Sequence, residues 1–346
     1  MLIAVYAIAL NEEQFVKRFC DSAKDADLII IGDTGSTDNT IALAKECGAV
    51  VPSIFISPWR FDKARDAVLS LIPTDIDICI SLDLDEVLEE GWREEVEKLW
   101  TPETTRMRYK FDVGPNGIFY GEKIHARKGY FWKWPCHEWL QADPRITEHV
   151  VTTDKLLARH LPDTTKSRSQ YLPLLEVATK EDPADHRSAF YYARELYFNK
   201  QWNEAIESFR RYLLIPSAIW HTERSYARRT IAKCLENIGQ DPIPELIIST
   251  EETPEIRESW VDLAQAYYNI NNWEDCYRCI LISLEKSREY THCEDPLSWA
   301  ERPYDLASIA AWNMEMTYEA IKHCKRALEY NPTDPRLLNN LKLMTQ

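Results

Sequence analysis

The sequence predicts an α/β domain with a mostly parallel sheet over residues 1–165 and an all-α domain of helical repeats over residues 166–346. In the first part, short β-rich runs alternate with helical patterns, which is typical of βαβ units. The apolar runs there lack polar alternation, as expected for strands that are covered on both faces. Beyond about residue 166 the strand pattern ends and amphipathic helical patterns follow one another. A length of 346 residues also corresponds to about two domains.

The elements expected in the first part alternate in type along the chain. Apolar runs predict the strands, and patterns with a helical period predict the helices between them. The expected strands cover residues 2–9, 27–32, 50–56 and 76–82, and the expected helices cover residues 13–23, 37–47, 63–71 and 92–100. In such a sheet, ligands bind beyond the carboxyl ends of the strands.

The second part repeats itself with a period of about 34 residues. Residues 189–213, 260–284 and 304–332 place small and large apolar residues at the same offsets. In the middle segment these are Trp260, Leu263, Ala264, Tyr267, Cys276, Ile280 and Leu284. The gap between the first two segments leaves room for one degenerate repeat around residues 225–235. The spacing resembles the tetratricopeptide repeat, and a generic helical bundle is the alternative.

The charge of the chain argues against nucleic acid or membrane as its main electrostatic partner. Asp and Glu number 56 against 41 Lys and Arg, which gives a formal net charge of -15. Such a surface repels phosphate backbones and anionic headgroups. The nine cysteines are odd in number and scattered, and Cys276 and Cys279 are their only close pair. We therefore expect buried thiols in a reducing cytosol.

The apolar N-terminus is interpreted as a buried strand. It lacks the basic start and the small-residue cleavage site of a signal peptide and runs directly into Asn11 and Glu12. No stretch reaches the roughly 18 uncharged apolar residues that a membrane helix needs. We expect a cytoplasmic protein without a transmembrane segment, and peripheral attachment at the inner membrane face is left open.

Acidic motifs directly follow two of the expected strands. Asp33 begins a loop that opens a helix, where an anion would bind, and a simple polar turn is the alternative. Asp83 and Asp85 follow the strand at 76–82, and strand alternation places both on the same side. Paired carboxylates suit a hard divalent cation such as Mg²⁺ or Mn²⁺, and a solvated acidic strand end is the alternative.

Four segments, in this order, resemble the nucleotide-sugar glycosyltransferases of family 2, which have the GT-A fold. They are Asn-Glu-Glu at 11–13, Asp-Thr-Gly-Ser-Thr-Asp at 33–38, Phe-Asp-Lys-Ala-Arg-Asp at 61–66, and Leu-Asp-Leu-Asp-Glu at 82–86. His137-Glu138 and the helical-repeat tail resemble a bacterial and phage-type subgroup that appends tetratricopeptide repeats. The resemblance covers nearly the whole chain. It implies a Rossmann-like GT-A glycosyltransferase domain followed by a tetratricopeptide-like domain.

The resemblance also implies roles for individual residues. In such enzymes the Asp33 position contacts the nucleobase, and the Arg65 position lies on the nucleotide. Asp83 would face the ribose or the metal, and Asp85 would ligate the metal that bridges the diphosphate. Further contacts with the nucleotide sugar are implied for Asn11, Glu13 and His137. The segment reads Ala-Arg-Asp where many relatives have Arg-Asn, so no contact is carried over to Asp66.

An inverting transfer also needs a carboxylate that deprotonates the acceptor hydroxyl, on a different segment from the metal ligands. We predict Glu138 in this role, because the aromatic side chains within residues 131–139 would partly desolvate it. Three of these aromatic residues are expected to stack on a sugar acceptor: Trp132, Trp134 and Trp139. The alternative is a Glu138 that pairs with Lys133 or Arg145, beside ordinary core tryptophans.

His160, near the end of the first part, is expected to complete the metal site with Asp85. Relatives often have a histidine near this point, and imidazole suits Mn²⁺. A structural histidine at the domain junction is the alternative, and His137 is a second candidate for the metal. A short basic patch would meet the diphosphate or form a solvated strand face: Lys123, His125 and Arg127.

The sequence therefore predicts an inverting, Mn²⁺- or Mg²⁺-dependent hexosyltransferase that uses a nucleoside-diphosphate sugar, with UDP as the expected nucleotide. The acceptor would be a hydroxyl of a carbohydrate or a peptide. The repeats would bind a protein or pair two subunits. One competing hypothesis is a tetratricopeptide interaction scaffold with a non-catalytic α/β half. Another is a nucleotidyltransferase, but the acidic segment after the first strand has the wrong charge for an incoming triphosphate.

Overall fold

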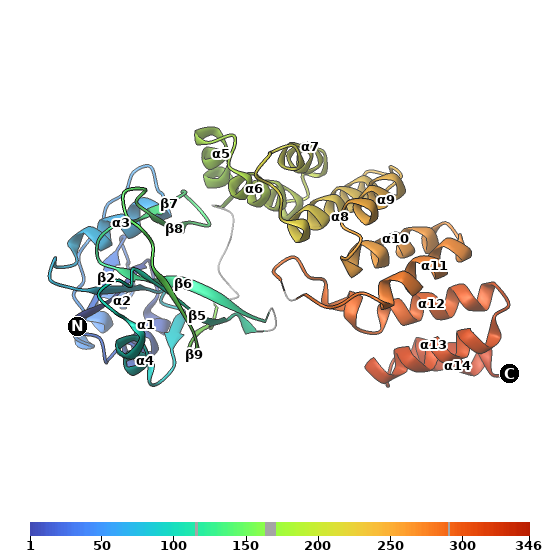
Figure 1. The fold of residues 1–346 in the computed structure, drawn as a ribbon, viewed down its shortest axis with the longest axis horizontal. Coiled ribbons are helices and arrows are strands. Elements are labelled where there is room, and N and C mark those ends of the chain that lie inside the picture. Colours follow the sequence, from blue (N-terminus) through green and yellow to red (C-terminus); the bar gives the residue numbers. More distant parts are fainter. Residues whose placement is uncertain (115–116, 163–170, 290) are drawn as a thin grey trace. The chain divides into compact units, whose positions relative to one another are not determined.

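A computed structural model describes residues 1–114, 117–162, 171–289 and 291–346. The chain forms two compact units, Met1–Lys180 and Glu181–Gln346 (Figure 1). The boundary that the sequence predicts between residues 165 and 166 lies outside the described residues. Helix α5 (Tyr171–Glu181) belongs almost entirely to the first unit. Each unit has its own architecture, and together they confirm the predicted α/β class with an all-α continuation.

A mixed sheet forms the centre of the first unit. Its order in the described residues is β2-β1-β3-β6-β5-β9-β4. The strands are β1 (Ile3–Ala9), β2 (Leu28–Asp33), β3 (Ile78–Ser81), β4 (Glu86–Leu88), β5 (Arg106–Asp112), β6 (Ile118–Ala126) and β9 (Val150–His160). β1 pairs in parallel with β2 and β3, and β5 pairs in parallel with β9. The other pairings are antiparallel. A separate hairpin consists of β7 (Tyr130–Lys133) and β8 (Trp139–Ala142).

Both faces of the central strand β1 are buried, which explains why its sequence is a continuous apolar run. Side chains at odd positions, such as Val5, enter a cluster formed with helices α1 (Glu13–Ser22) and α4 (Trp92–Leu99). Side chains at even positions, such as Tyr6, enter a second cluster with helix α3 (Phe61–Leu71) and the β7–β8 hairpin. The alternation of a strand thus places helices on one face, and a helix and a hairpin on the other.

Two expected elements differ in the structure, and further strands were not expected. Residues 50–56 contribute only isolated bridges, from Val50 to Ile30 and from Ser53 to Asp33, and no strand. Helix α2 (Thr40–Glu46) begins three residues later than expected, because the preceding residues are held in a loop by side chains. Strands β5 to β9 lie beyond the elements expected from the sequence.

The second unit is a run of helices, each packed on its neighbours in the chain (Figure 1). They are α6 (His186–Phe198), α7 (Trp202–Leu213), α8 (His221–Asn237), α9 (Ile243–Glu252), α10 (Arg257–Asn269), α11 (Trp273–Leu284), α12 (Arg302–Asn313), α13 (Thr317–Tyr330) and α14 (Pro335–Met344), with a 3₁₀ turn, η2, at Pro296–Trp299. Three of their pairs, α6–α7, α10–α11 and α12–α13, coincide with the three repeated segments. Repeat positions such as Ala264, Cys276 and Ala320 are fully buried, as core positions should be.

All nine cysteines lie in the described part of the chain and are free thiols. Eight are buried, as expected, and Cys47 at the end of α2 is exposed. Cys276 and Cys279 face the core around α11. In the described residues, no helix combines the length and the apolarity needed to cross a bilayer.

Candidate active site

Charged side chains gather at the edge of the sheet where the parallel strands end. Asp33 ends β2, while Asp83 and Asp85 directly follow β3. His160 ends β9, which the pairings orient in the same direction as β3. Glu138 reaches this edge from the loop that connects β7 with β8. This is the edge at which α/β proteins bind their ligands.

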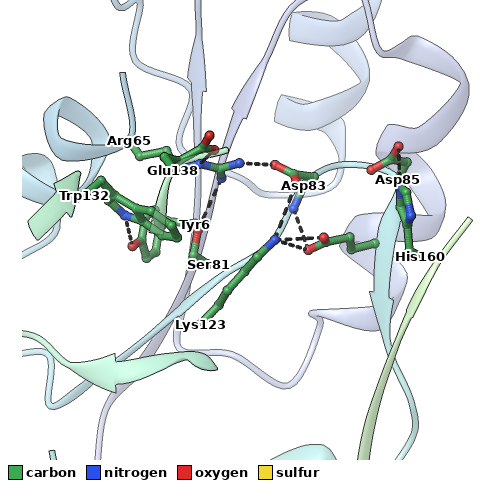
Figure 2. Close-up of polar contacts among 10 residues, drawn as sticks. Tyr6, Arg65, Ser81, Asp83, Asp85, Lys123, Trp132, Glu138 and His160 are labelled. Atoms are coloured by element: carbon green, nitrogen blue, oxygen red, sulfur yellow. Dashed lines mark hydrogen bonds and ion pairs between the residues drawn. The ribbon is translucent and has the colours of Figure 1, made fainter. Parts of the chain in front are cut away.

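Arg65 on α3 connects two segments of the site (Figure 2). Its Nη2 lies 2.5 Å from Oδ1 of Asp83, and its Nε lies 2.6 Å from Oε1 of Glu138. The side chain is 4% exposed and stands over the ring of Trp132, 5.0 Å from the ring centroid. Burial opposes the charge, but the two carboxylates outweigh it and raise the pKa of Arg65. The guanidinium therefore stays charged and fixes both carboxylates.

Lys123 on β6 is the second cation of the site. Its Nζ lies 2.8 Å from Oε1 of the buried Glu86 and 3.5 Å from Oδ2 of Asp83. Although burial opposes ionisation, the charges of Arg65 and Lys123 lower the pKa of Asp83 well below its usual value. Burial raises the pKa of Glu86 despite the neighbouring ammonium group. Asp83 thus has one oxygen turned to each cation.

Asp85 and His160 form a separate pair next to this network (Figure 2). Nε2 of His160 lies 3.3 Å from Oδ2 of Asp85, and both side chains are only partly buried. The hydrogen bond to Asp85 raises the pKa of His160 against the opposing effect of burial. In the described residues, no group of three or more His, Cys, Asp or Glu side chains is arranged to hold a metal. A metal at this pair would therefore take its remaining ligands from substrate or water.

Three of the residues expected to contact the nucleotide sugar shape the loop after β2. The Asp33 carboxylate accepts hydrogen bonds from the backbone N–H groups of Gly35 and Ser36. Oδ1 of Asn11 accepts one from the N–H of Thr37, at 2.8 Å. Oε2 of Glu13 accepts a hydrogen bond from the backbone N–H of Asn39, at 2.9 Å. These side chains hold residues 34–39 at the carboxyl end of β2, where a nucleotide would bind.

The aromatic residues around Glu138 differ in exposure. Trp132 and Trp134 are 2% and 4% exposed, so neither presents a ring face to solvent. Trp132 donates from Nε1 to the hydroxyl of Tyr6 at 2.8 Å and belongs to the core. Trp139 is 40% exposed and keeps an accessible surface. Of the three tryptophans expected to stack on a sugar acceptor, only Trp139 therefore has an accessible ring.

The partner of Glu138 is neither of the two that the sequence suggested. Arg145 pairs with Asp143, and Nζ of Lys133 stands 4.1 Å from the ring centroid of Trp134. His137 adopts a left-handed backbone conformation, with φ of 51°, and its ring lies 5.6 Å from that of Tyr171. Glu138 therefore pairs with Arg65. In the described part of the chain, the Asp85–His160 pair has no contact with His137.

The expected basic patch is divided among three environments. Lys123 joins the acidic network, while Arg127 donates to the backbone oxygen of Ile72. His125 is fully buried, between the hydroxyl of Tyr6 and the backbone oxygen of Ala126. Burial lowers the pKa of His125 to about 3, so the ring is neutral and does not serve as a basic group.

Sequence reasoning assigned no role to four supporting residues: Tyr6, Ser81, Glu86 and Asp66. The Oγ of Ser81 lies 3.4 Å from Nη1 of Arg65, and Oδ1 of Asp66 accepts from the backbone N–H of Trp132 at 2.8 Å. Glu86 could have been suspected from its place beside two other acidic residues. Tyr6 could not, because one tyrosine within an apolar strand gives no signal of its polar partners.

No protein-family profile matches the chain. Among solved structures, it is similar to MamA, with 16% identity over 46% of this chain and 86% of that chain and a TM-score of 0.38. It is also similar to YrrB, described as a TPR protein with an unusual peptide-binding site, with 14% identity over 50% of this chain and 83% of that chain and a TM-score of 0.39.

Curated relatives match part of the chain. The lipopolysaccharide core biosynthesis glycosyltransferase LpsC of Rhizobium meliloti (strain 1021) is 30% identical over 131 residues, 36% of this chain and 48% of the relative. The uncharacterized glycosyltransferase RC0292 of Rickettsia conorii (strain ATCC VR-613 / Malish 7) is 29% identical over 99 residues, 28% of this chain and 34% of the relative. The chain thus spans less than half the length of these relatives. Both are named glycosyltransferases, which agrees with the resemblance of this chain to glycosyltransferases.

Proposed function

We propose that this chain is a glycosyltransferase that moves a hexose from a nucleoside-diphosphate sugar, with UDP as the nucleotide, to an acceptor hydroxyl with inversion. The observation that supports the proposal is the position of Arg65, which pairs with both Asp83 and Glu138. We assign Asp83 to the donor side and Glu138 to the acceptor side of this sheet edge. An inverting transfer requires a group that stabilises the leaving diphosphate and a base that takes the proton of the acceptor hydroxyl.

The donor would bind across the loop after β2. Asp33, Asn11 and Glu13 fix that loop, and Arg65 and Asp83 border it at the next strand end. The charges of the site favour a divalent cation. Four carboxylates, those of Asp83, Asp85, Glu86 and Glu138, lie near two permanent cations, so an anionic diphosphate would meet excess negative charge. A divalent cation would offset that repulsion.

Asp85 and His160 fit such a cation better than Asp83 does. Their carboxylate oxygen and imidazole nitrogen are already close, are partly accessible, and form a donor set suited to Mn²⁺ or Mg²⁺. Both oxygens of Asp83 face Arg65 and Lys123, so its proposed role is to orient the donor side. When bound, the metal would supply Lewis-acid stabilisation of the leaving diphosphate.

Glu138 is the proposed general base. Arg65 pairs with it and fixes its orientation, and its side chain is mostly buried. In the transfer, Glu138 accepts the proton of the acceptor hydroxyl while that oxygen bonds to the anomeric carbon. The bond from the anomeric carbon to the diphosphate breaks, and the nucleoside diphosphate leaves with its electron pair. Trp139, on the strand that follows Glu138, offers an exposed ring for stacking on the acceptor.

We propose a carbohydrate as the acceptor in preference to a peptide. The support is the name of the relative LpsC, which assigns it to lipopolysaccharide core biosynthesis. For the helical unit we propose binding of a protein partner or of a second copy of this chain. The buried free thiols support a reducing, cytoplasmic location.

Glu138→Gln tests the assignment of the base. The variant keeps the shape and a hydrogen-bond acceptor for Arg65 but cannot take a proton at neutral pH. We expect donor affinity within a few-fold of wild type and a loss of transfer of about 10²-fold or more. Calorimetry with UDP-glucose, UDP-galactose, UDP-GlcNAc and GDP-mannose, each with Mn²⁺, identifies the donor and measures its affinity. Product formation measures the rate of transfer. The exposed Glu90→Gln is the matched control. Transfer within a few-fold of wild type would place the base elsewhere, and failure of wild type to bind any donor would favour the scaffold hypothesis.

Asp85→Ala tests the metal site. We expect the variant to lose the part of donor affinity that depends on Mn²⁺, because one of the two protein ligands is gone. The measurement is donor affinity with Mn²⁺ and with a chelator. Asp75→Ala, at an exposed position outside the site, should behave as wild type. Equal affinity of wild type with and without Mn²⁺ would exclude the metal assignment.

A further inference from the structure

The aromatic ring that lies against Arg65 is held in turn by two buried polar side chains. Trp132, whose ring centroid lies 5.0 Å from the Arg65 guanidinium, donates from Nε1 to the hydroxyl of Tyr6 at 2.8 Å (Figure 2). The same hydroxyl lies 3.1 Å from Nε2 of His125. Tyr6 and His125 are fully buried, and Trp132 is 2% exposed. Side chains from β1, β6 and β7 thus meet at one hydroxyl group.

The direction of each hydrogen bond follows from the chemistry of its partners. Nδ1 of His125 lies 2.8 Å from the backbone oxygen of Ala126, which can only accept, so Nδ1 has the proton. Burial lowers the pKa of His125 to about 3, so the ring is neutral and Nε2 accepts. An indole nitrogen can only donate. The Tyr6 hydroxyl therefore donates to His125 and accepts from Trp132.

This series of hydrogen bonds fixes the position of the Trp132 ring. If the Tyr6 hydroxyl turned away, buried donors and acceptors would lose their partners, which costs free energy. The backbone of Trp132 is held separately, because its N–H donates to Oδ1 of Asp66 at 2.8 Å. Hydrogen bonds therefore hold both the ring and the backbone of this residue.

The orientation of Arg65 depends on that ring, because the buried guanidinium lies against its face. The hydrogen bonds from Arg65 to Asp83 and Glu138 are directional, so a tilt of the guanidinium would move its partners. The effect on the two carboxylates would differ. Among the described residues, Arg65 is the only charged side chain that pairs with Glu138, whereas Asp83 also lies 3.5 Å from Lys123.

We propose that Tyr6 is a positioning residue for the transfer, which acts through Trp132 on the orientation of Arg65 and thereby of Glu138. The proposal rests on the proposed function, in which Glu138 is the base. Tyr6 is fully buried, so it acts on the reaction without touching the donor or the acceptor. A displacement of about 1 Å in a reacting group can cost on the order of 10²-fold in rate, so a buried hydroxyl can control turnover.

Tyr6→Phe tests the proposal, because it removes the hydroxyl and keeps the ring. We expect kcat to fall about tenfold. Donor affinity with Mn²⁺ should stay within about threefold of wild type, because Asp33 and Asn11 hold the loop 34–39 without Tyr6. Product formation measures kcat and calorimetry measures donor affinity, both at a temperature at which the variant is folded. A loss of donor affinity as large as the loss of kcat would overturn the proposal, and so would a wild-type kcat.

Tyr212→Phe is the matched control. Tyr212 is also fully buried, and its hydroxyl donates to a carboxylate oxygen of Glu223 at 3.2 Å in the helical unit. The variant therefore loses a buried hydroxyl and its hydrogen bond, as Tyr6→Phe does, but it should keep the kcat of wild type. An equal fall of kcat in the two variants would show a general effect of lost stability and would overturn the proposal.

A double-mutant cycle tests whether Tyr6 acts through Trp132. Trp132→Phe keeps an aromatic ring but removes the Nε1–H donor. In this background, Tyr6→Phe should lower kcat by less than about twofold, because the hydrogen bond that it would break is already absent. Fully additive effects of the two substitutions on kcat would overturn the proposal.

His125 reaches the same hydroxyl from its other side and provides a second pair of variants. His125→Leu leaves the Tyr6 hydroxyl without its acceptor and should also lower kcat while donor affinity is kept. His125→Gln keeps an acceptor and should have a kcat within about twofold of wild type. Equal kcat values for the two variants would contradict the role of the Tyr6 hydroxyl, also if Tyr6→Phe itself does not fold.

Nuclear magnetic resonance of the full chain separates this inference from the proposed function. With ¹⁵N-labelled arginine, the Nε–H signal of Arg65, assigned with Arg65→Lys, reports its hydrogen bond to Glu138 without any substrate. Tyr6→Phe should shift this signal, and Tyr212→Phe should not. If wild type transfers no sugar and the signal shifts, the proposed function fails while the action of Tyr6 on Arg65 is supported. An unchanged signal would overturn the positioning role whether or not wild type is active.

Discussion

At the residue scale, the candidate site depends on a pair that no local pattern reveals. Arg65 and Glu138 are 73 residues apart in the chain, and each was assigned a role from its own segment. Their contact could not be predicted, because it depends on how α3 and the β7–β8 hairpin pack on the same face of the sheet. The Asp85–His160 pair was expected, since both residues occupy motif positions whose proximity the resemblance implies.

His125 makes stability depend on pH. Its pKa in the folded chain is about 3 because of burial, against about 6.5 when unfolded. Below about pH 6.5 the unfolded chain therefore binds a proton that the folded chain does not, and stability falls as the pH falls. Between pH 7 and pH 5.5 this residue should cost about 1 kcal/mol of unfolding free energy. Urea unfolding at the two pH values measures it.

His125→Gln provides the comparison, because glutamine keeps a polar side chain but does not titrate in this range. The variant should lose about 1 kcal/mol less than wild type over the same interval, since other groups contribute equally to both. An identical pH dependence of the two proteins would show that the pKa of the imidazole does not differ between the folded and the unfolded chain.

At the element scale, the β7–β8 hairpin determines where Glu138 lies. The hairpin is attached to α3 through Asp66, whose Oδ1 accepts the backbone N–H of Trp132. Burial raises the pKa of Asp66. An uncharged side chain with a carbonyl oxygen can accept the same hydrogen bond from the backbone N–H of Trp132. This explains how the segment 64–66 can end in Asp where many relatives end in Asn, since an amide oxygen can accept from the same N–H.

Replacing Asp66 should therefore separate two effects. Asp66→Ala leaves the buried N–H of Trp132 without its acceptor, which should cost about 1–2 kcal/mol of unfolding free energy and speed hydrogen exchange at that amide. Asp66→Asn should stay close to wild type in both measurements. If the alanine variant shows the same exchange rate at Trp132 as wild type, another contact attaches the hairpin.

Helices and strands were predictable where their sequences show a clear hydrophobic pattern. β1 and β2 were predictable because each is a continuous apolar run, and α1 because its apolar residues repeat with the period of a helix. β5 was not, since Arg106, Arg108 and Lys110 alternate with its apolar residues and give it a polar composition. Residues 50–56 are apolar enough for a strand, but they form only single bridges to β2, which no local pattern distinguishes from a full ladder.

At the scale of the whole molecule, each unit has a core of its own. The clusters around β1 use residues from the first unit only, and the cluster around α10 to α13 uses residues from the second. The division into an α/β part and a helical part was predictable, because the two parts differ in hydrophobic period. Helix α5 has a helical pattern and yet belongs mainly to the α/β unit, which the hydrophobic period alone does not reveal.

Residues 1–182 should therefore fold and bind the donor without the helical unit. All proposed donor contacts and both proposed metal ligands lie in this fragment. We expect donor affinity with Mn²⁺ within about threefold of the full chain, which is less than 1 kcal/mol, and a cooperative unfolding transition by circular dichroism. A folded fragment that does not bind the donor would show that the helical unit contributes to the donor site.

The distribution of thiols has a practical consequence for studying the donor site. Within the described residues, Cys47 alone among the cysteines is exposed, and it terminates α2, the helix that begins directly after the loop 34–39. Buried thiols react slowly with aqueous reagents, so a maleimide fluorophore would attach to the natural chain at essentially one position. The chain thus carries its own attachment point for an optical reporter that would test the proposed binding of a nucleotide, and no cysteine has to be added or removed.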